Sequence, residues 1–424
     1  MFARHAVPAA LVAGSLLSGF VTPTVADPPP ASDTNEVECD EQCQWAWWQQ
    51  RQNAVPRTEF YDPPSTLPPP TAGTLIRHEP AAEYVVEGGP MVATRVLYRS
   101  ADSSGEAVAA SGVVLVPTGE PPADGWPVIL HAHGVSGIGR ECAPSLMRDL
   151  YHGDQIARFV EQGWAVVAPD YAGLGTDGRH ELLNKSAAAN DLLGALRAAY
   201  EVVPELSSDW LLWGHSQGGA AVLATAERLV NKPEAGYLGA VVTSPASDLR
   251  RIITRAVDQP GLGVFMALAS AGAKESEPQL RVERLLTPQA LHRLAIAETG
   301  CLGVVTAVYR DLSGPDLVND KFLYEPHFGR FLDTNRTGRR AVAGPVLLLQ
   351  GEADSVIPVE FTDDVSAGLC QKGVSVDYRT YPGLEHDTYP GVVTGITDGA
   401  MPDILDWVGE RFDGEPAAST CPAD

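Results

Sequence analysis

Basic residues are scarce in this chain of 424 residues, in which 30 Lys and Arg stand against 54 Asp and Glu and give a formal net charge of −24. No run of Lys or Arg stands out along the sequence. Surfaces that bind nucleic acid through its phosphates carry a basic patch, so the composition argues against a nucleic-acid partner. The acidic surface is simply explained by solubility.

Long apolar runs are also missing, except at the N-terminus. Ala6 to Val21 is apolar, follows Arg4 and His5, and precedes the small residues Thr24-Val25-Ala26. This segment is short for a membrane span, and its layout is typical of a secretory signal peptide, residues 1–26, cleaved after Ala26. An N-terminal anchor is the alternative. We expect a secreted, soluble protein without stable membrane insertion.

Cysteine is sparse, and its number is even. The six cysteines are Cys39, Cys43, Cys142, Cys301, Cys370 and Cys421. In an exported chain an even number favours disulfides, although the sequence leaves many pairings open. Cys39 and Cys43 resemble half of a zinc site, but no second cluster completes it, so we expect no metal.

Proline dominates residues 27–80. Its clusters are Pro28–Pro30, Pro63–Pro64 and Pro68–Pro70. This density predicts neither a helix nor a central strand, and therefore an extended arm on the domain or a linker. Trp45, Trp47 and Trp48 favour an arm that packs, because such rings usually cover a surface. Carbohydrate binding by these rings is the alternative.

Strand and helix patterns alternate between residues 81 and 245. The predicted strands are Met91–Tyr98, Ala107–Pro117, Val128–Leu130, Trp164–Pro169, Leu211–Trp213 and Leu238–Thr243. Helical periodicity is clearest over Ser186–Val202. Such alternation predicts an α/β fold, with a mostly parallel sheet flanked by helices.

The alternation stops over residues 246–340, which show helical patches but no convincing strand. The patches are Leu249–Ala256, Val264–Ala273 and Pro288–Ala297. We therefore expect a helical insertion between two parts of the sheet. The sheet resumes in residues 341–424, where the predicted elements are the strands Pro345–Gln350 and Val374–Tyr381 and the helix Met401–Phe412.

The segment Gly214-His215-Ser216-Gln217-Gly218 lies between an apolar run and a helix pattern rich in small residues. This order predicts a strand, a sharp turn and a helix, with Ser216 at the apex. The turn requires very small neighbours, which Gly214 and Gly218 supply. It would hold the hydroxyl where a histidine can take its proton. We expect His215 to pack rather than react.

Two partners follow in the order nucleophile, acid, histidine that is found in α/β-hydrolases. Asp354 comes directly after a predicted late strand, with Glu352 as the rival acid and a helix N-cap as the alternative role for Asp354. His386 follows the next strand, and no later histidine exists. This order favours His386 as the base and Asp354 as its orienting acid. Asp387 is expected to point away.

An oxyanion hole requires backbone N–H groups directed at the developing negative charge. Gln217, at the start of the predicted helix, should donate one. The other should come from Val135, in the loop after an early strand, with Gly134 as the alternative. His131 and His133 suggest a metal at first sight, but on a strand of this kind we expect them to brace the loop.

Together these motifs resemble the secretory lipase family, which includes yeast lipase-A-type enzymes and many actinobacterial secreted lipases. The resemblance runs from about Phe60 to the C-terminus. It rests on Phe60-Tyr61-Asp62-Pro63-Pro64, Gly73-Thr74-Leu75-Ile76-Arg77, Gly125-Trp126-Pro127-Val128, His133-Gly134, Cys142-Ala143-Pro144-Ser145, Asp170-Tyr171-Ala172-Gly173-Leu174-Gly175, Gly214-His215-Ser216-Gln217-Gly218-Gly219 and Gly351-Glu352-Ala353-Asp354.

The resemblance implies an α/β-hydrolase core, a helical lid over an acyl-chain pocket, and hydrolysis of triacylglycerols and simpler esters without a cofactor. It also implies a disulfide between Cys142 and Cys301. The remaining cysteines would then pair as Cys370 with Cys421 and Cys39 with Cys43. One departure is Val135, since relatives often have threonine after the His-Gly of the oxyanion loop.

The predicted function is therefore a secreted serine ester hydrolase, a lipase that acts on lipid esters at a lipid–water interface as a monomer. Two alternatives stay open: a secreted serine peptidase or aminopeptidase on the same fold, and a non-catalytic binding protein. The predicted lid offers Val264, Phe265, Met266 and Leu268 as an apolar wall, which plain packing of the lid would explain equally well.

Overall fold

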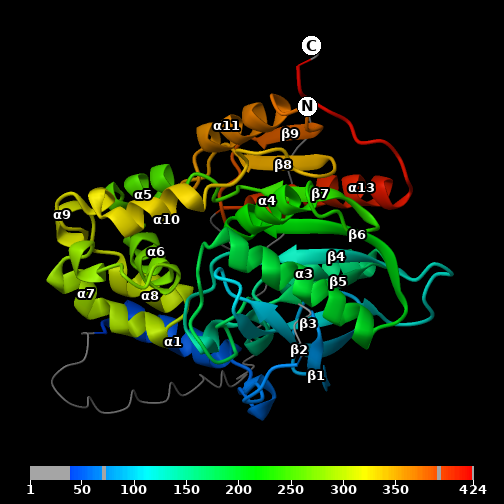
Figure 1. Ribbon diagram of the computed structural model, residues 1–424, viewed down its shortest axis with the longest axis horizontal. Helices are drawn as coiled ribbons and strands as arrows, with labels where there is room; N and C mark the ends of the chain where they lie inside the picture. Colours follow the sequence, from blue (N-terminus) through cyan, green and yellow to red (C-terminus); the bar gives the residue numbers. More distant parts are fainter. Residues whose placement is uncertain (1–38, 69–72, 389–392, 423–424) are drawn as a thin grey trace, which may run out of the picture. The chain divides into compact units, whose positions relative to one another are not determined.

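The computed structural model describes residues 39–68, 73–388 and 393–422. Within this part of the chain, nine strands form one sheet in the order β1-β2-β3-β5-β4-β6-β7-β8-β9 (Figure 1). The strands are β1 (Leu75–Ala81), β2 (Met91–Ala101), β3 (Ala107–Pro117), β4 (Trp126–Ala132), β5 (Ala165–Pro169), β6 (Leu206–His215), β7 (Tyr237–Thr243), β8 (Val346–Gly351) and β9 (Val376–Tyr381). The predicted signal peptide lies outside the described residues.

The sheet is antiparallel at its beginning and parallel in the rest. β1, β2 and β3 pair antiparallel, as do β3 and β5, whereas every later pair from β5 to β9 is parallel. Parallel strands need covered faces, and β6 shows how both are buried. Trp210 and Leu212 pack on one side, while Leu211 and Trp213 pack on the other.

Helices cover both faces of the sheet, as the α/β prediction requires. α3 (Lys185–Val202), α4 (Gln217–Leu229) and α11 (Val359–Cys370) contribute to one core cluster. α2 (Gly153–Glu161), α12 (Ile396–Gly399) and α13 (Met401–Phe412) contribute to the other. This arrangement is the α/β-hydrolase fold. Its central strands place their carboxyl ends at one edge, where the loops meet.

A helical segment joins β7 to β8 and contains no named strand. Its helices are α5 (Leu249–Asp258), α6 (Gly263–Ser276), α7 (Pro288–Arg293), α8 (Leu302–Tyr309), α9 (Gly314–Leu317) and α10 (Pro326–Thr334). Figure 1 shows them gathered to one side of the sheet. Below, this segment is called the lid helices. The disulfide between Cys142 and Cys301 ties the start of α8 to the core.

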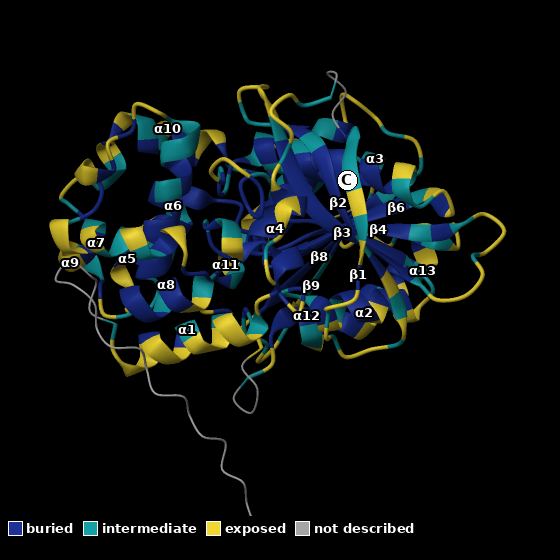
Figure 2. Ribbon diagram, turned by 90° about the horizontal axis from the view of Figure 1, so that it is seen from below, coloured by how far each residue is buried: buried dark blue, intermediate teal, exposed yellow. Residues whose placement is uncertain are grey.

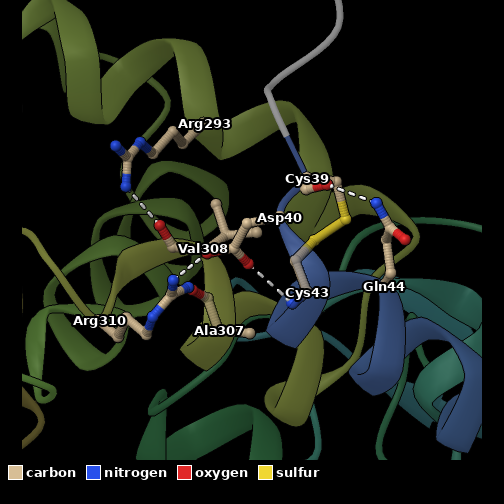
Figure 3. The surroundings of a disulfide bond; sticks show 8 residues. All are labelled: Cys39, Asp40, Cys43, Gln44, Arg293, Ala307, Val308 and Arg310. Carbon is tan, nitrogen blue, oxygen red and sulfur yellow. Dashed lines mark hydrogen bonds and ion pairs between the residues drawn. A yellow bond between two sulfur atoms is a disulfide. The ribbon is translucent and has the colours of Figure 1, made fainter. Parts of the chain in front are cut away.

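The prediction that residues 27–80 contain no helix was wrong. α1 (Glu41–Asn53) occupies a stretch that lies between proline clusters and contains no proline itself. The Asp40 side chain caps it by accepting the Cys43 N–H at 3.0 Å. The Cys39–Cys43 disulfide closes this end of α1 on itself, and an ion pair between Asp40 and Arg310 holds it against the lid helices (Figure 3).

α1 lies along α8, but much of its outer surface is exposed (Figure 2). Trp45 and Trp48 are 58% and 51% exposed, so the expectation that these two rings cover a surface was wrong. Trp47 is half-buried. The third disulfide joins Cys370 to Cys421, so the structure contains the three pairs that the resemblance implies.

Candidate active site

Ser216 stands between the end of β6 and the start of α4 with a strained backbone. Its φ of +56° lies in the left-handed region, which non-glycine residues adopt only where the surroundings enforce it. A Cβ on Gly218 would lie 1.8 Å from the Ala132 carbonyl oxygen, and one on Gly214 would lie 2.4 Å from that of Gly218. The two glycines therefore allow backbones to approach more closely than any side chain permits.

Ser216, His386 and Asp354 form one hydrogen-bonded chain, although they are far apart in sequence. The Ser216 hydroxyl lies 2.9 Å from His386 Nε2, and His386 Nδ1 lies 2.8 Å from Asp354 Oδ2. All three side chains are buried. With Nδ1–H donating to the carboxylate, Nε2 of the neutral ring can accept the serine proton.

Asp354 is held by its own turn. One carboxylate oxygen accepts the N–H groups of Val356 and Ile357 at 2.9 and 2.7 Å, and the other accepts the Gln350 amide at 3.1 Å. The rival Glu352 does not contact His386; its carboxylate accepts the Thr380 hydroxyl at 2.8 Å. Hence Asp354 is the acid that faces the imidazole.

Within this hydrogen-bonded network, Asp354 and His386 each stabilise the charged form of the other. Burial raises the pKa of Asp354, but the His386 imidazole and hydrogen bonds outweigh it and hold that pKa below its ordinary value. Burial lowers the pKa of His386, but the carboxylates of Asp354, Asp387 and Glu385 outweigh it and raise that pKa overall. Asp354 therefore stays ionised, and His386 keeps its added proton up to a higher pH than a free imidazole does.

The loop after β4 brings Gly134 and Val135 to the serine. A Cβ on Gly134 would lie 3.8 Å from Ser216 Cβ, and Val135 lines the same cavity as Ser216. The loop is fixed from behind, since the Tyr151 hydroxyl donates to the Val135 carbonyl and the Ser136 carbonyl accepts the Leu302 N–H at 2.8 Å. Sequence reasoning missed Tyr151, because no motif marks it.

Beside Ser216 lies a small apolar cavity of about 30 Å³. Its wall consists of Val135, Leu182, Leu183, Ser216, Ala246, Leu249, Ile252, Ile253, Phe265, Leu268, Val356 and Ile357. Of the four lid residues predicted as a wall, Phe265 and Leu268 line this cavity, whereas Val264 and Met266 are buried elsewhere. A larger cavity of about 210 Å³ shares Leu183, Ala246 and Leu249 and includes Gln217 in its wall.

His131 and His133, the other histidines of the loop, are buried, and burial favours their uncharged forms. His131 stacks on Trp213, with ring centroids 4.3 Å apart. His133 lies 2.6 Å from the Gly134 carbonyl and 3.1 Å from that of Asp170, so it does brace the loop. Burial lowers the pKa of His133 to about 4.

In the described part of the chain, one group has donor atoms close enough together to suggest a metal. The donor atoms of His215, His386 and Asp387 lie within 4.8 Å of one another. Both His386 nitrogens already contact Ser216 and Asp354, so a metal would take the imidazole from that chain. The expectation that Asp387 points away was wrong: its carboxylate lies 3.5 Å from His215 Nε2, and residues 386 and 387 form a bend.

Among the described residues, no helix is long and apolar enough to cross a membrane.

Comparisons with known proteins agree with the fold. The chain shares 20% identity with Candida antarctica lipase A, at a TM-score of 0.73 over 87% of this chain and 89% of that one. A rice cell wall degrading esterase of Xanthomonas oryzae superposes with a TM-score of 0.67 at 18% identity, covering 81% of this chain and 100% of that one.

Two relatives in sequence bear names that differ on activity. A probable inactive lipase of Mycobacterium tuberculosis is 26% identical over 84% of this chain and 82% of its own length. A secreted triacylglycerol lipase of Malassezia globosa is 25% identical over 85% of this chain and 82% of its own. The sequence profile of secretory lipases matches residues 151–420, more than half of the chain. The chain thus belongs to the secretory lipase family.

Proposed function

We propose that this chain is a secreted serine carboxylic-ester hydrolase that acts as a lipase. The observation that carries the proposal is the hydrogen-bonded chain Ser216–His386–Asp354, which ends at an apolar cavity. Family membership alone is not enough, since one relative bears the name of a probable inactive lipase. An intact nucleophile, base and acid within hydrogen-bond distance support catalysis.

The reaction proceeds in two acyl-transfer steps. His386 Nε2 takes the Ser216 proton while the serine oxygen attacks the ester carbonyl. The tetrahedral intermediate collapses, the bond to the alcohol oxygen breaks, and His386 returns its proton to the departing alcohol. Water, deprotonated by His386, then attacks the acyl carbonyl; the second intermediate collapses, the bond to Ser216 Oγ breaks, and His386 returns the proton to Oγ as the carboxylic acid leaves. Asp354 orients His386 and stabilises its charged form throughout.

The negative charge of each intermediate needs donors beside Ser216. We assign this role to the backbone N–H groups of Gln217 and Val135, with Gly134 as the alternative to Val135. Gln217 begins α4, where the helix dipole favours an anion. Val135 has no side-chain hydroxyl, so the backbone must supply the second donor.

The apolar cavity favours an acyl chain as the group bound on the lid side. Its lining is almost entirely aliphatic or aromatic, and α5 and α6 supply much of it. A volume of about 30 Å³ holds roughly one water molecule, so an acyl chain needs more space than this cavity offers by itself. The N-terminal signal pattern and the relatives named as secreted support export.

Hydrolysis of p-nitrophenyl esters from acetate to palmitate, together with emulsified triacylglycerol, tests this function. We expect activity that extends to long chains and triacylglycerol. Ser216→Ala should lose roughly 10⁴-fold or more in kcat while folding normally. Activity on short esters alone would limit the function to an esterase. A wild-type protein that hydrolyses no ester would contradict the proposal.

A further inference from the structure

A second histidine–carboxylate pair lies against the proposed catalytic histidine. Asp387 Oδ1 lies 3.5 Å from His215 Nε2, and the His215 and His386 rings are in contact, tilted by 47° with 4.5 Å between centroids. His215 is 2% exposed, and its Nδ1 lies 3.1 Å from the Thr243 hydroxyl at the end of β7. The His215 ring thus contacts Thr243 on one edge, has the Asp387 carboxylate near the other, and packs against the His386 ring.

We propose that His215 and Asp387 are positioning residues that hold the His386 imidazole and stabilise its protonated form. The inference rests on the proposed function, because it assigns these residues to the same proton transfer. Asp387 does not replace Asp354, which alone has a recorded hydrogen bond to His386 Nδ1. Instead, its carboxylate contributes a second negative charge within 4.8 Å of the imidazole.

This arrangement matters at the step in which His386 becomes charged during acyl transfer. His386 must carry a positive charge after it takes the Ser216 proton, and burial disfavours that charge. A neutral His215 beside Asp387 adds no repulsion to a charged His386, and burial lowers the pKa of His215. With its proton on Nε2, His215 turns an N–H toward the Asp387 carboxylate at ion-pair distance, and its Nδ1 can accept from the Thr243 hydroxyl.

Other charged and titratable groups around His386 determine which substitution isolates the effect of Asp387. Asp354 and Glu385 add negative charge, and Glu385 itself accepts the Ser355 N–H at 3.1 Å. Burial lowers the pKa of His152, which packs beyond His215, to about 3, so this ring is neutral. Arg255 of α5 reaches the Ser355 carbonyl at 3.5 Å. Asp387 is the carboxylate at ion-pair distance from His215.

The experiment measures the labelling rate of Ser216 by a fluorophosphonate probe against pH, with EDTA present to exclude metal at the cluster. This rate reports the Ser216–His386 pair without requiring any ester substrate. In Asp387→Asn the acid limb of the profile should move to lower pH, because His386 then protonates less readily. The alkaline plateau should fall by less than about tenfold, since Asp387 is half-exposed and screened.

Asp387→Glu should restore the wild-type acid limb. The matched control is Asp398→Asn, which removes an equal charge from the same region, where Asp398 accepts from Gln155 and Thr388, and it should leave the limb in place. An unchanged limb in Asp387→Asn would overturn the inference. If that variant does not fold, Asp387→Ser gives the same reading. A wild-type protein that the probe does not label would instead refute the proposed function.

Discussion

The two sides of the candidate site are built differently. On the core side, Ser216, His386 and Asp354 stand on strand ends and turns whose backbones touch, so that Gly218 has no space for a methyl group. On the lid side, helices present interchangeable apolar side chains such as Phe265 and Leu268 to a small cavity. We therefore infer that the core side determines the reaction, whereas the side chains of the lid side determine which substrate fits.

The largest expected contrast is between two glycines. Gly218→Ala should destabilise the protein by about 4 kcal/mol or more, because its Cβ would lie 1.8 Å from the Ala132 carbonyl oxygen. Gly303 in α8 has open space around it, so Gly303→Ala should stabilise by roughly 0.5–1 kcal/mol. Thermal unfolding of both variants tests this. Equal effects would mean that the two sides are equally constrained.

The disulfide between core and lid should matter next. Replacing Cys142 and Cys301 together by serine should cost roughly 2–5 kcal/mol, because the bond closes a loop with a sequence separation of 159 residues. The matched double serine variant of Cys39 and Cys43, with a separation of 4, should cost less. Chemical denaturation measures both. A larger loss from the short loop would contradict this ranking.

A change in the cavity wall should alter selectivity rather than chemistry. Phe265→Ala enlarges the cavity, and the ratio of kcat/KM for long over short p-nitrophenyl esters should rise by roughly tenfold. Val264→Ala is the control, since Val264 is buried in the same helix but does not line the cavity. It should lower stability and leave the ratio unchanged. The assignment of the lid side fails if the two variants shift selectivity equally.

The smallest expected effect is a shift in the pH at which half of the activity is lost. The base must be neutral to accept the Ser216 proton, and its neighbours raise the pKa of His386 above the ordinary value of 6.5. Activity should therefore be complete at alkaline pH and disappear as pH falls through that raised pKa. The pH profile of kcat/KM gives the midpoint. A midpoint below the ordinary value would show that burial dominates and that the carboxylates contribute little.

The sequence predicted the core side well because its signals are local or follow from chain order. The strand–turn–helix pattern around Ser216 is encoded in a few adjacent residues, and β3 and α13 have the bounds expected from periodicity. Asp354 and His386 were found by their place after late strands, and the structure brings them together with Ser216.

The remaining features depend on packing, which local patterns do not encode. α1 was missed because a high average proline content concealed a stretch without proline. The direction of Asp387 depends on a bend, and the difference between Phe265 and Val264 depends on how α6 is rotated against the core. Tyr151 was missed for the same reason, since only the folded chain brings its hydroxyl to Val135.

The most direct test of the central claim is the mass of the protein after reaction with a long-chain alkyl fluorophosphonate. The account predicts one covalent adduct on Ser216 in the wild type, and a labelling rate that is lower by roughly 10³-fold or more in His386→Ala. An adduct on another residue, or a rate that does not depend on His386, would contradict it.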